Sequence, residues 1–237
     1  HFDNKNLLDD HVLFTLKELK KYTKVIFFTS NSKIPKNKKA ILKSLVDRVV
    51  ERKNEGMDWN GWKSLLNSEK AEWYRQFDEM ILLNNSVFGP VVKLGPVFEN
   101  MKKKDWDFWT PTEWKYYKPH VLNVKPHAQP YFLVLKKRLF LDKTFWNFWN
   151  LIPKHFKSYI DAVYNAEVKM TIYFEKKGFR RATYADEFDN LDHPDIGAFE
   201  PHSYHAADHL VRYYNTPFVK IKAFGNHDKT PFSRYSL

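Results

Sequence analysis

Three polar residues, Asn84-Asn85-Ser86, directly follow a short apolar run and are the first candidates for chemistry in this chain. The run, from Met80 to Leu83, is bounded by polar and turn residues, which predicts a buried strand. In an open α/β sheet, ligands bind beyond the carboxyl ends of the strands. Amides and a hydroxyl there can hydrogen-bond a sugar or a pyrophosphate, although carboxylates are better ligands for a hard divalent cation. A strand that ends in an Asn-rich turn without a ligand is the alternative.

A second candidate is the loop Asn54-Glu55-Gly56-Met57-Asp58, which follows one predicted strand and precedes a predicted helix. A glycine lets the backbone approach a ligand closely, and the Asp58 carboxylate can accept hydrogen bonds from a base or a ribose. A plain connecting loop is an equally good interpretation of these residues.

Glu167 is the candidate for acid–base chemistry. It lies near the start of a predicted helix, ten residues before Lys177-Gly178. Such a carboxylate can deprotonate an acceptor hydroxyl as a general base. The alternative is that it only stabilises the amino end of the helix electrostatically.

Three histidines, His202, His205 and His209, share one face if their segment is helical, with Asp208 beside them. Three imidazoles can hold a metal ion, but this spacing is not a specific metal signature. A polar surface helix explains the pattern more simply.

On the side of an acceptor, we predict contacts from Trp109, Glu113 and His127. The face of an aromatic ring suits the apolar side of a pyranose, although most tryptophans belong to the core. His127 stands in a predicted loop.

The elements that position these residues alternate between short strands and helices. We expect strands at 24–30, 47–51, 78–83, 106–110, 131–136 and 217–224, and helices from about 10, at 36–43, before 66, and at 98–104, 140–149, 162–177 and 206–214. This alternation favours an α/β fold with a mostly parallel sheet.

The composition of the 237 residues is that of a folded basic protein. Hydrophobic residues make up 43% and aromatic residues 17%, which is enough for a large core, and the formal net charge is +11. The charge favours anionic partners such as nucleic acid, phosphorylated small molecules or an acidic membrane surface. The absence of cysteine excludes disulfides, thiol catalysis and cysteine-bound zinc. No apolar run approaches the roughly 18 residues of a membrane span, and no signal peptide is visible.

The chain begins with His1-Phe2-Asp3 and leads into a helix without a preceding strand. An α/β domain usually opens with a strand. We therefore expect that the chain is part of a longer protein or lacks its first strand.

Taken in order, these stretches resemble the rhamnan synthesis protein F family of bacterial polysaccharide glycosyltransferases. The combined order is specific, although no single piece is, and the matching pieces cover nearly the whole chain: HFDNKNLLDDHVLFTLKEL, KNEGMDWNGWKSLL, DEMILLNNSVFGP, KDWDFWTPTEW, HAQPYFLVLKKRLF with FWNFW, AEVKMTIYFEKKGF and NTPFVKIKAF.

The resemblance implies a GT-A-like fold, in which a mostly parallel sheet is flanked by helices and one half is a Rossmann-like nucleotide-binding unit. Residues 1–237 would form one glycosyltransferase-like domain, with 1–110 as the donor half and 111–237 as the acceptor half. The implied donor is a nucleoside-diphosphate sugar, in this family dTDP-L-rhamnose. The implied acceptor is a growing polysaccharide or a lipid-linked glycan at the cell surface.

Carried over by position, Glu55, Gly56 and Asp58 resemble the donor-binding loop. Asn84-Asn85-Ser86 occupies the place of an Asp-x-Asp metal clamp, and Glu167 occupies the place of the catalytic base. The chain departs from the family in having Asn85 where Asp is common. A divalent cation, Mn²⁺ or Mg²⁺, is thus left open, with Asn85 and His209 as its candidate ligands.

The function that we predict is transfer of a sugar, with inversion, by a cytoplasmic enzyme whose basic surface contacts the inner face of the plasma membrane. The alternative is a non-catalytic module that holds glycan or nucleotide within a larger polysaccharide-synthesis protein. Nucleic-acid binding ranks last, because no zinc finger, RNP-like motif or basic helix with heptads is present.

Overall fold

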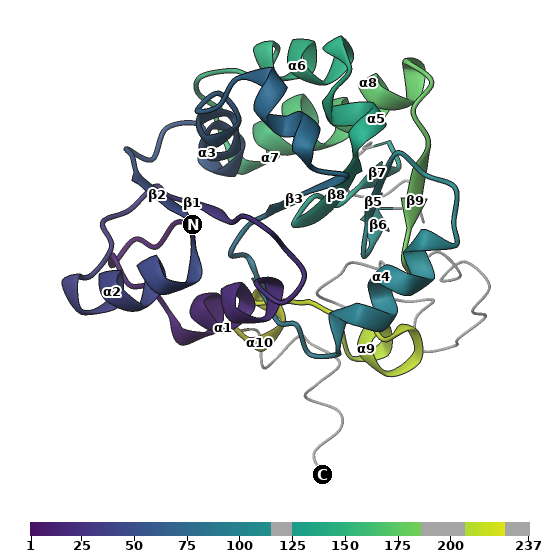
Figure 1. Ribbon diagram of the computed structural model, residues 1–237. Helices are drawn as coiled ribbons and strands as arrows, with labels where there is room; N and C mark the ends of the chain where they lie inside the picture. Colours follow the sequence, from purple (N-terminus) through teal and green to yellow (C-terminus); the bar gives the residue numbers. More distant parts are fainter. Residues whose placement is uncertain (115–124, 186–206, 226–237) are drawn as a thin grey trace.

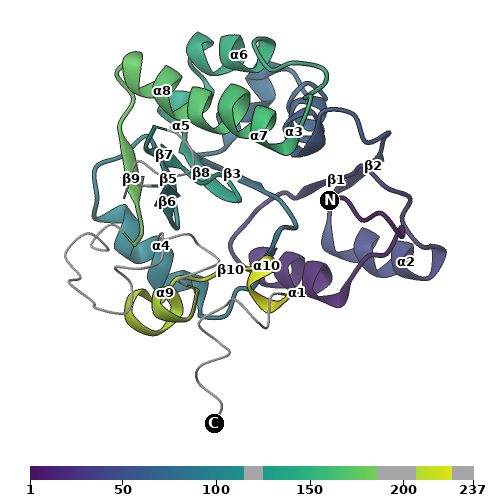
Figure 2. The ribbon, with the colours of Figure 1, turned by 180° about the vertical axis from the view of Figure 1, so that it is seen from behind.

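A computed structural model describes residues 1–114, 125–185 and 207–225 of the chain. These residues form a mixed α/β structure with a sheet between two groups of helices (Figure 1). Figure 2 shows α6, α7 and α8 on one side of the sheet and α9, β10 and α10 on the other. No helix of the described residues combines the length and the apolar character that crossing a bilayer requires.

The strands are short. They are β1 (Phe27–Ser30), β2 (Arg48–Glu51), β3 (Glu79–Leu83), β4 (Val87–Phe88), β5 (Phe108–Thr110), β6 (Glu113–Trp114), β7 (His127–Ala128), β8 (Phe132–Lys136), β9 (Arg181–Thr183) and β10 (Val219–Lys220). The helices are α1 (Asp10–Leu19), α2 (Lys36–Leu45), α3 (Met57–Leu66), α4 (Leu94–Lys102), α5 (Lys137–Phe140), α6 (Lys143–Asn150), α7 (Tyr159–Ala162), α8 (Lys169–Lys176), α9 (Ala207–Tyr214) and α10 (Lys222–Gly225). A 3-10 turn spans Ala71–Gln76.

The largest sheet in the described residues has the order β3-β8-β5-β9. β8 is antiparallel to both β3 and β5, and only β5 and β9 are parallel. Three further pairs stand apart from it: parallel β1–β2, antiparallel β10–β4 and antiparallel β6–β7. The predicted α/β class is confirmed, but the sheets are short and mixed rather than one mostly parallel sheet. The reason is that β8 runs back between β3 and β5.

The helix that carries Glu167 begins earlier than the sequence indicated. Ser158 caps it, since its hydroxyl accepts a hydrogen bond of 3.1 Å from the backbone N–H of Asp161. The helical stretch then runs through α7, a π-helical segment at Val163–Val168 and α8. Glu167 therefore lies in the middle of the stretch, and the prediction that it stands near a helix start was wrong.

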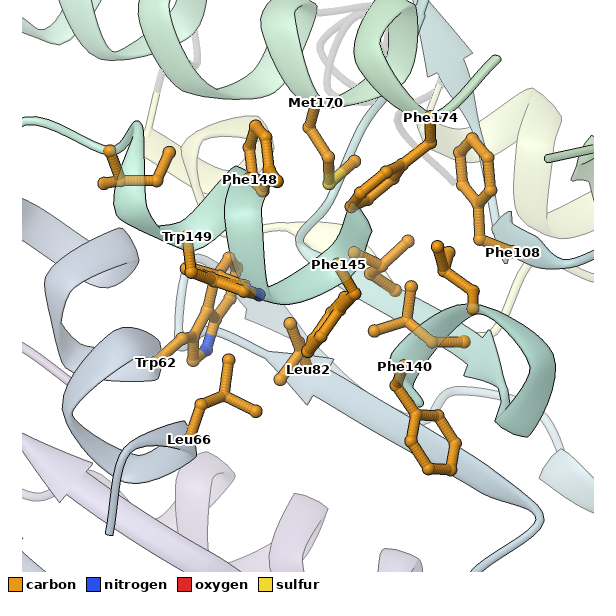
Figure 3. Packing of buried hydrophobic residues seen from close by; sticks show 14 of the residues in the cluster. Trp62, Leu66, Leu82, Phe108, Phe140, Phe145, Phe148, Trp149, Met170 and Phe174 are labelled. Carbon is orange, nitrogen blue, oxygen red and sulfur yellow. The ribbon is translucent and has the colours of Figure 1, made fainter. Parts of the chain in front are cut away.

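The main core lies between the sheet and the helices α3, α5, α6 and α8 (Figure 3). Aromatic side chains dominate it, and Phe140, Phe148 and Phe108 are completely buried. Each large apolar side chain buried in this way stabilises the fold by about 1.5–3 kcal/mol. A second cluster covers the other face of the sheet through α4 and includes Trp106, and a third joins α1 and α2 to β1.

Candidate functional site

Four polar residues from three separate parts of the chain form a continuous line of hydrogen bonds. Lys220 Nζ donates to Ser86 Oγ at 3.0 Å, and this hydroxyl donates to Asn84 Oδ1 at 2.6 Å. Asn84 Nδ2 in turn donates to Asp58 Oδ2 at 3.0 Å. We call these four residues the Asp58–Lys220 chain. It places two opposite charges at the ends of a polar line beyond the carboxyl end of β3.

Each member is positioned by a backbone element. The backbone N–H of Asn84 donates to the carbonyl of Tyr131 at 3.2 Å, so this residue still follows β8 past the end of β3. Asp58 lies in the first turn of α3, where a carboxylate is favoured by the helix dipole. Lys220 ends β10, and the next residue donates its N–H to the carbonyl of Ser86 at 3.0 Å.

Glu167 lies near this chain and has an unusual acidity. Its side chain is only 22% exposed, and burial raises its pKa to about 7, opposed by the nearby Lys220 cation and reinforced by the Asp58 carboxylate. A carboxyl group with this pKa is about half ionised at neutral pH, which suits acid–base work. The π-helical segment in which it stands is a feature frequently found at functional sites.

Lys220 is a candidate site residue that the sequence patterns do not reveal. Burial lowers its pKa to about 8, while the carboxylates of Glu167 and Asp58 act in the opposite direction. Its ammonium also lies 4.6 Å from the centre of the Tyr131 ring, a cation–π contact. The signal in the sequence is a lysine inside the apolar stretch PFVKIKAF, a pattern that by itself predicts only a strand.

The predicted loop contributes Asp58 to the site, whereas Gly56 and Glu55 make contacts with other parts of the protein. Gly56 has φ +71°, and a Cβ at this position would meet the Asn60 side chain and the Lys154 carbonyl oxygen. The glycine is therefore needed for the left-handed turn and for close packing within the protein. Glu55 lies 4.0 Å from the Lys154 ammonium.

Asn85 is occupied by a contact within the protein. Its Oδ1 accepts from the backbone N–H of Phe2 at 3.1 Å, and its Nδ2 donates to the Phe2 carbonyl at 3.1 Å. Within the described residues, no three His, Cys, Asp or Glu side chains gather as metal ligands. The donors around Asn85 therefore fit a divalent cation poorly, and the cation stays a prediction of the resemblance.

The three residues predicted on the acceptor side are separated by the structure. His127 is 3% exposed and its Nε2 lies 3.9 Å from Glu167 Oε2, so it borders the site, and burial lowers its pKa. Glu113 forms an ion pair with Arg181. Trp109 is 1% exposed and packs against Phe132 in the core, where it presents no surface to an acceptor.

The predicted histidine cluster is only partly described. His209 lies in α9, where its ring centre is 4.5 Å from that of Tyr213. His202 and His205 fall outside the described residues.

Comparisons with known proteins show what the chain as a whole is similar to. The model of one family, described as Rhamnan synthesis protein F, matches residues 26–237. Uncharacterized protein y4gN of Sinorhizobium fredii (strain NBRC 101917 / NGR234) is 24% identical over 158 residues, which are 65% of this chain and 39% of that protein. The chain thus spans well under half of that relative. The solved structure of A197 from STIV covers 65% of this chain and 78% of its own, with 13% identity and a TM-score of 0.32, a likeness too low to carry an argument.

Proposed function

We propose that this chain, which belongs to the rhamnan synthesis protein F family, acts in rhamnan synthesis as a glycosyltransferase. The donor would be a nucleoside-diphosphate sugar, with L-rhamnose as the sugar that the family description favours. The acceptor would be a growing polysaccharide or a lipid-linked glycan of the cell surface. Residues 1–110 would hold the donor and residues 111–237 the acceptor, within one GT-A-like domain.

The observation that carries the proposal is Glu167, a carboxyl group whose pKa is about 7 beside the Asp58–Lys220 chain. Transfer of a sugar to a hydroxyl needs a base that is ionised at working pH yet basic enough to take a proton. An ordinary exposed glutamate is ionised but about 2–3 pKa units less basic. Burial gives Glu167 the required basicity without a dedicated proton relay.

The reaction proposed is a single displacement. The acceptor hydroxyl attacks the anomeric carbon of the donor while Glu167 takes its proton, and the bond to the nucleoside diphosphate breaks as the new glycosidic bond forms. This displacement inverts the anomeric configuration. Asp58 and Asn84, in the donor half, offer hydrogen-bond partners for the donor. Lys220 reaches them from the acceptor half and offers a cation for the negative charge that develops on the leaving diphosphate.

A basic surface supports contact with an anionic membrane, where lipid-linked acceptors reside. The formal net charge of +11 gives a long-range attraction to anionic lipid. This peripheral contact would be weakened by salt.

The experiment is a transfer assay with the purified protein, a panel of nucleoside-diphosphate sugars and a glycan acceptor, with and without Mn²⁺ or Mg²⁺. Glu167→Gln should lower the turnover rate by about 10²–10⁴-fold and leave donor binding in place. The matched control is Glu175→Gln, a residue on α8 that pairs with Arg181 at 2.8 Å. Unchanged turnover in Glu167→Gln would reject the base assignment.

A second candidate function is a non-catalytic module that binds glycan or nucleotide. It is favoured by Asn85, whose amide is engaged with Phe2 where the related enzymes often have a metal-binding aspartate. A thermal-shift screen separates the two, because a ligand that binds only the folded state raises Tm whether or not it is turned over. A shift with a nucleotide sugar, combined with no transfer or hydrolysis in any tested condition, would establish the module.

A further inference from the structure

The polar triplet that follows β3 offers no anionic oxygen to a metal ion. Asn84 Oδ1 accepts two hydrogen bonds from Ser86, one from its backbone N–H at 3.1 Å and one from its hydroxyl at 2.6 Å. An amide oxygen has two lone pairs, so both of them are used. Asn84 Nδ2 donates to Asp58, and only the oxygen of an amide binds hard cations. A divalent cation at Asn84 would therefore have to break these bonds.

The third residue of the triplet already contacts a cation of the protein. Lys220 Nζ lies 3.0 Å from Ser86 Oγ. Burial lowers the pKa of this ammonium, while the carboxylates of Glu167 and Asp58 raise it. The ammonium therefore interacts with two carboxylates, as a bound metal ion would, and it does so at the triplet that the family resemblance assigns to a metal ion.

A second lysine adds to the positive charge at this place. Lys222 lies in α10, and its ammonium is 5.0 Å from the centre of the Tyr159 ring. After burial, the Lys222 cation is a further cause that lowers the pKa of Lys220, so the two ammonium groups are close enough to interact. A diphosphate is attracted by both charges, whereas a divalent cation is repelled by both.

The Lys220 ammonium is held in place and can still be reached by a ligand. Its cation–π contact with the Tyr131 ring, at 4.6 Å from the ring centre, supports it from one side. An ammonium carries three N–H donors and Ser86 accepts one of them, so within the described residues donors remain for a phosphate oxygen. Lys220 is half-buried and Ser86 beside it is exposed. A diphosphate can therefore approach from the side of Ser86.

We propose that Lys220 takes the place of a divalent cation, so that this chain binds nucleoside diphosphates and their sugars without a metal. The inference rests on the proposed function and adds to it the group that holds the diphosphate. During transfer, the electron pair of the broken C–O bond stays on the leaving phosphate oxygen. The Lys220 ammonium donates a hydrogen bond to this oxygen and keeps its own proton, while the proton of the acceptor hydroxyl goes to Glu167.

The first test measures binding of dTDP and UDP by isothermal titration calorimetry, in EDTA and in Mn²⁺ or Mg²⁺. The wild-type Kd in EDTA should lie within about 2-fold of the Kd with either metal. Lys220→Met should weaken binding by at least about 10-fold, because it removes a charge-assisted hydrogen bond to phosphate. Lys220→Arg keeps a cation that suits phosphate and should recover most of the affinity.

Lys176→Met is the matched control for the change in net charge. Lys176 lies on α8, nine residues after Glu167 and therefore about 14 Å further along the helical stretch. Its substitution should leave the Kd of both nucleotides unchanged. A loss of affinity as large as that of Lys220→Met would mean that overall charge, and not the position of Lys220, holds the diphosphate, and the inference would be wrong.

Transfer assays distinguish this inference from the proposed function. Turnover in EDTA should lie within about 2-fold of turnover with metal, and Lys220→Met should lower it by about 10²–10³-fold. Wild-type turnover that requires Mn²⁺ or Mg²⁺ would overturn the inference and leave the proposed function standing. Metal-free nucleotide binding that requires Lys220, with no transfer in any condition, would reject the transferase and keep the diphosphate site. Wild-type protein that binds neither nucleotide, or binding that Lys220→Met leaves unchanged, would overturn the inference.

Discussion

The two sides of β3 are filled in different ways. On the side of β8 and the helices that cover it, aromatic and aliphatic side chains are tightly packed. Phe148 and Leu135 have no exposed surface there. Toward β1, the same strand borders a cavity, and no strand of the described residues pairs with it on that side. The packed core thus lies on one side of this strand, while on the other side Thr29 Oγ1 and His11 Nε2, which line the cavity, have no hydrogen-bond partner among the described residues.

The largest predicted effect compares two leucines on neighbouring strands. Leu135→Ala on β8 should lower the free energy of unfolding by about 2–5 kcal/mol, because it leaves a new cavity in a packed core. Leu83→Ala on β3 should cost roughly 1 kcal/mol or less, since that side chain already borders empty space. Urea denaturation measures both. Equal losses would show that the two sides of β3 are packed alike.

The next effect concerns pH and Glu167. Its pKa is about 7 in the folded protein against an ordinary 4.5, so the folded state holds a proton that the unfolded chain releases between these values. The contribution of this proton to the free energy of unfolding is therefore fully present below pH 4.5 and is lost as the pH rises through 7. The free energy of unfolding should fall by an amount on the order of 3 kcal/mol over this range. Glu167→Gln should flatten this part of the pH–stability curve, and Glu175→Gln should not. A wild-type curve that does not fall between pH 5 and 7.5 would contradict the buried carboxyl.

A smaller effect sharpens the link between Glu167 and Lys220. Lys220→Met removes the cation that holds the carboxyl pKa down, so this pKa should rise further, by about one unit. Lys222→Met is the matched control, because that cation acts on Lys220 rather than on Glu167. Carboxyl NMR titration gives the pKa directly. An unchanged Glu167 pKa in Lys220→Met would show that the two side chains do not interact electrostatically.

The smallest effect compares two helix starts, one on each side of β3. The Asp142 carboxylate accepts from the Thr144 N–H at 2.7 Å and caps α6, so Asp142→Ala should cost about 1 kcal/mol. Asp9 precedes α1 without a side-chain cap bond, and Asp9→Ala should change stability by less than about 0.5 kcal/mol. Thermal denaturation of the two variants in parallel tests the contrast. A loss as large for Asp9 would mean that it caps α1 in solution.

Local patterns in the sequence predicted local structure well. The apolar run at Met80–Leu83 is β3, and the loop before Trp59 leads into α3, because strand and helix periodicity is written in consecutive residues. Strand order was beyond this reasoning. β8 lies between β3 and β5 through contacts between distant segments, and no pattern within a single segment encodes them.

In the candidate site, too, local sequence patterns predicted some residues, while contacts between distant segments were not predictable. Asp58, Asn84 and Ser86 were predicted from their places after strands, and the structure joins them in one line of hydrogen bonds. Lys220 lies 134 residues from its partner Ser86, and a lysine in a strand normally points to solvent. Trp109 was predicted to contact an acceptor but is buried in the core. Residue type alone does not distinguish a ring that stacks on a sugar from a ring of the core.

The π-helical segment at Val163–Val168 also has an evolutionary consequence. A π turn closes with one more residue than an α turn, so it shifts the phase between α7 and α8. Deleting one exposed residue there, such as Asn165, should restore a regular α-helix while Phe174 stays anchored in the core. The residues before the deletion would turn by about 100° relative to α8. Loss of a single codon is therefore a short genetic route to a regular helix in which α7 is turned relative to Glu167 and α8.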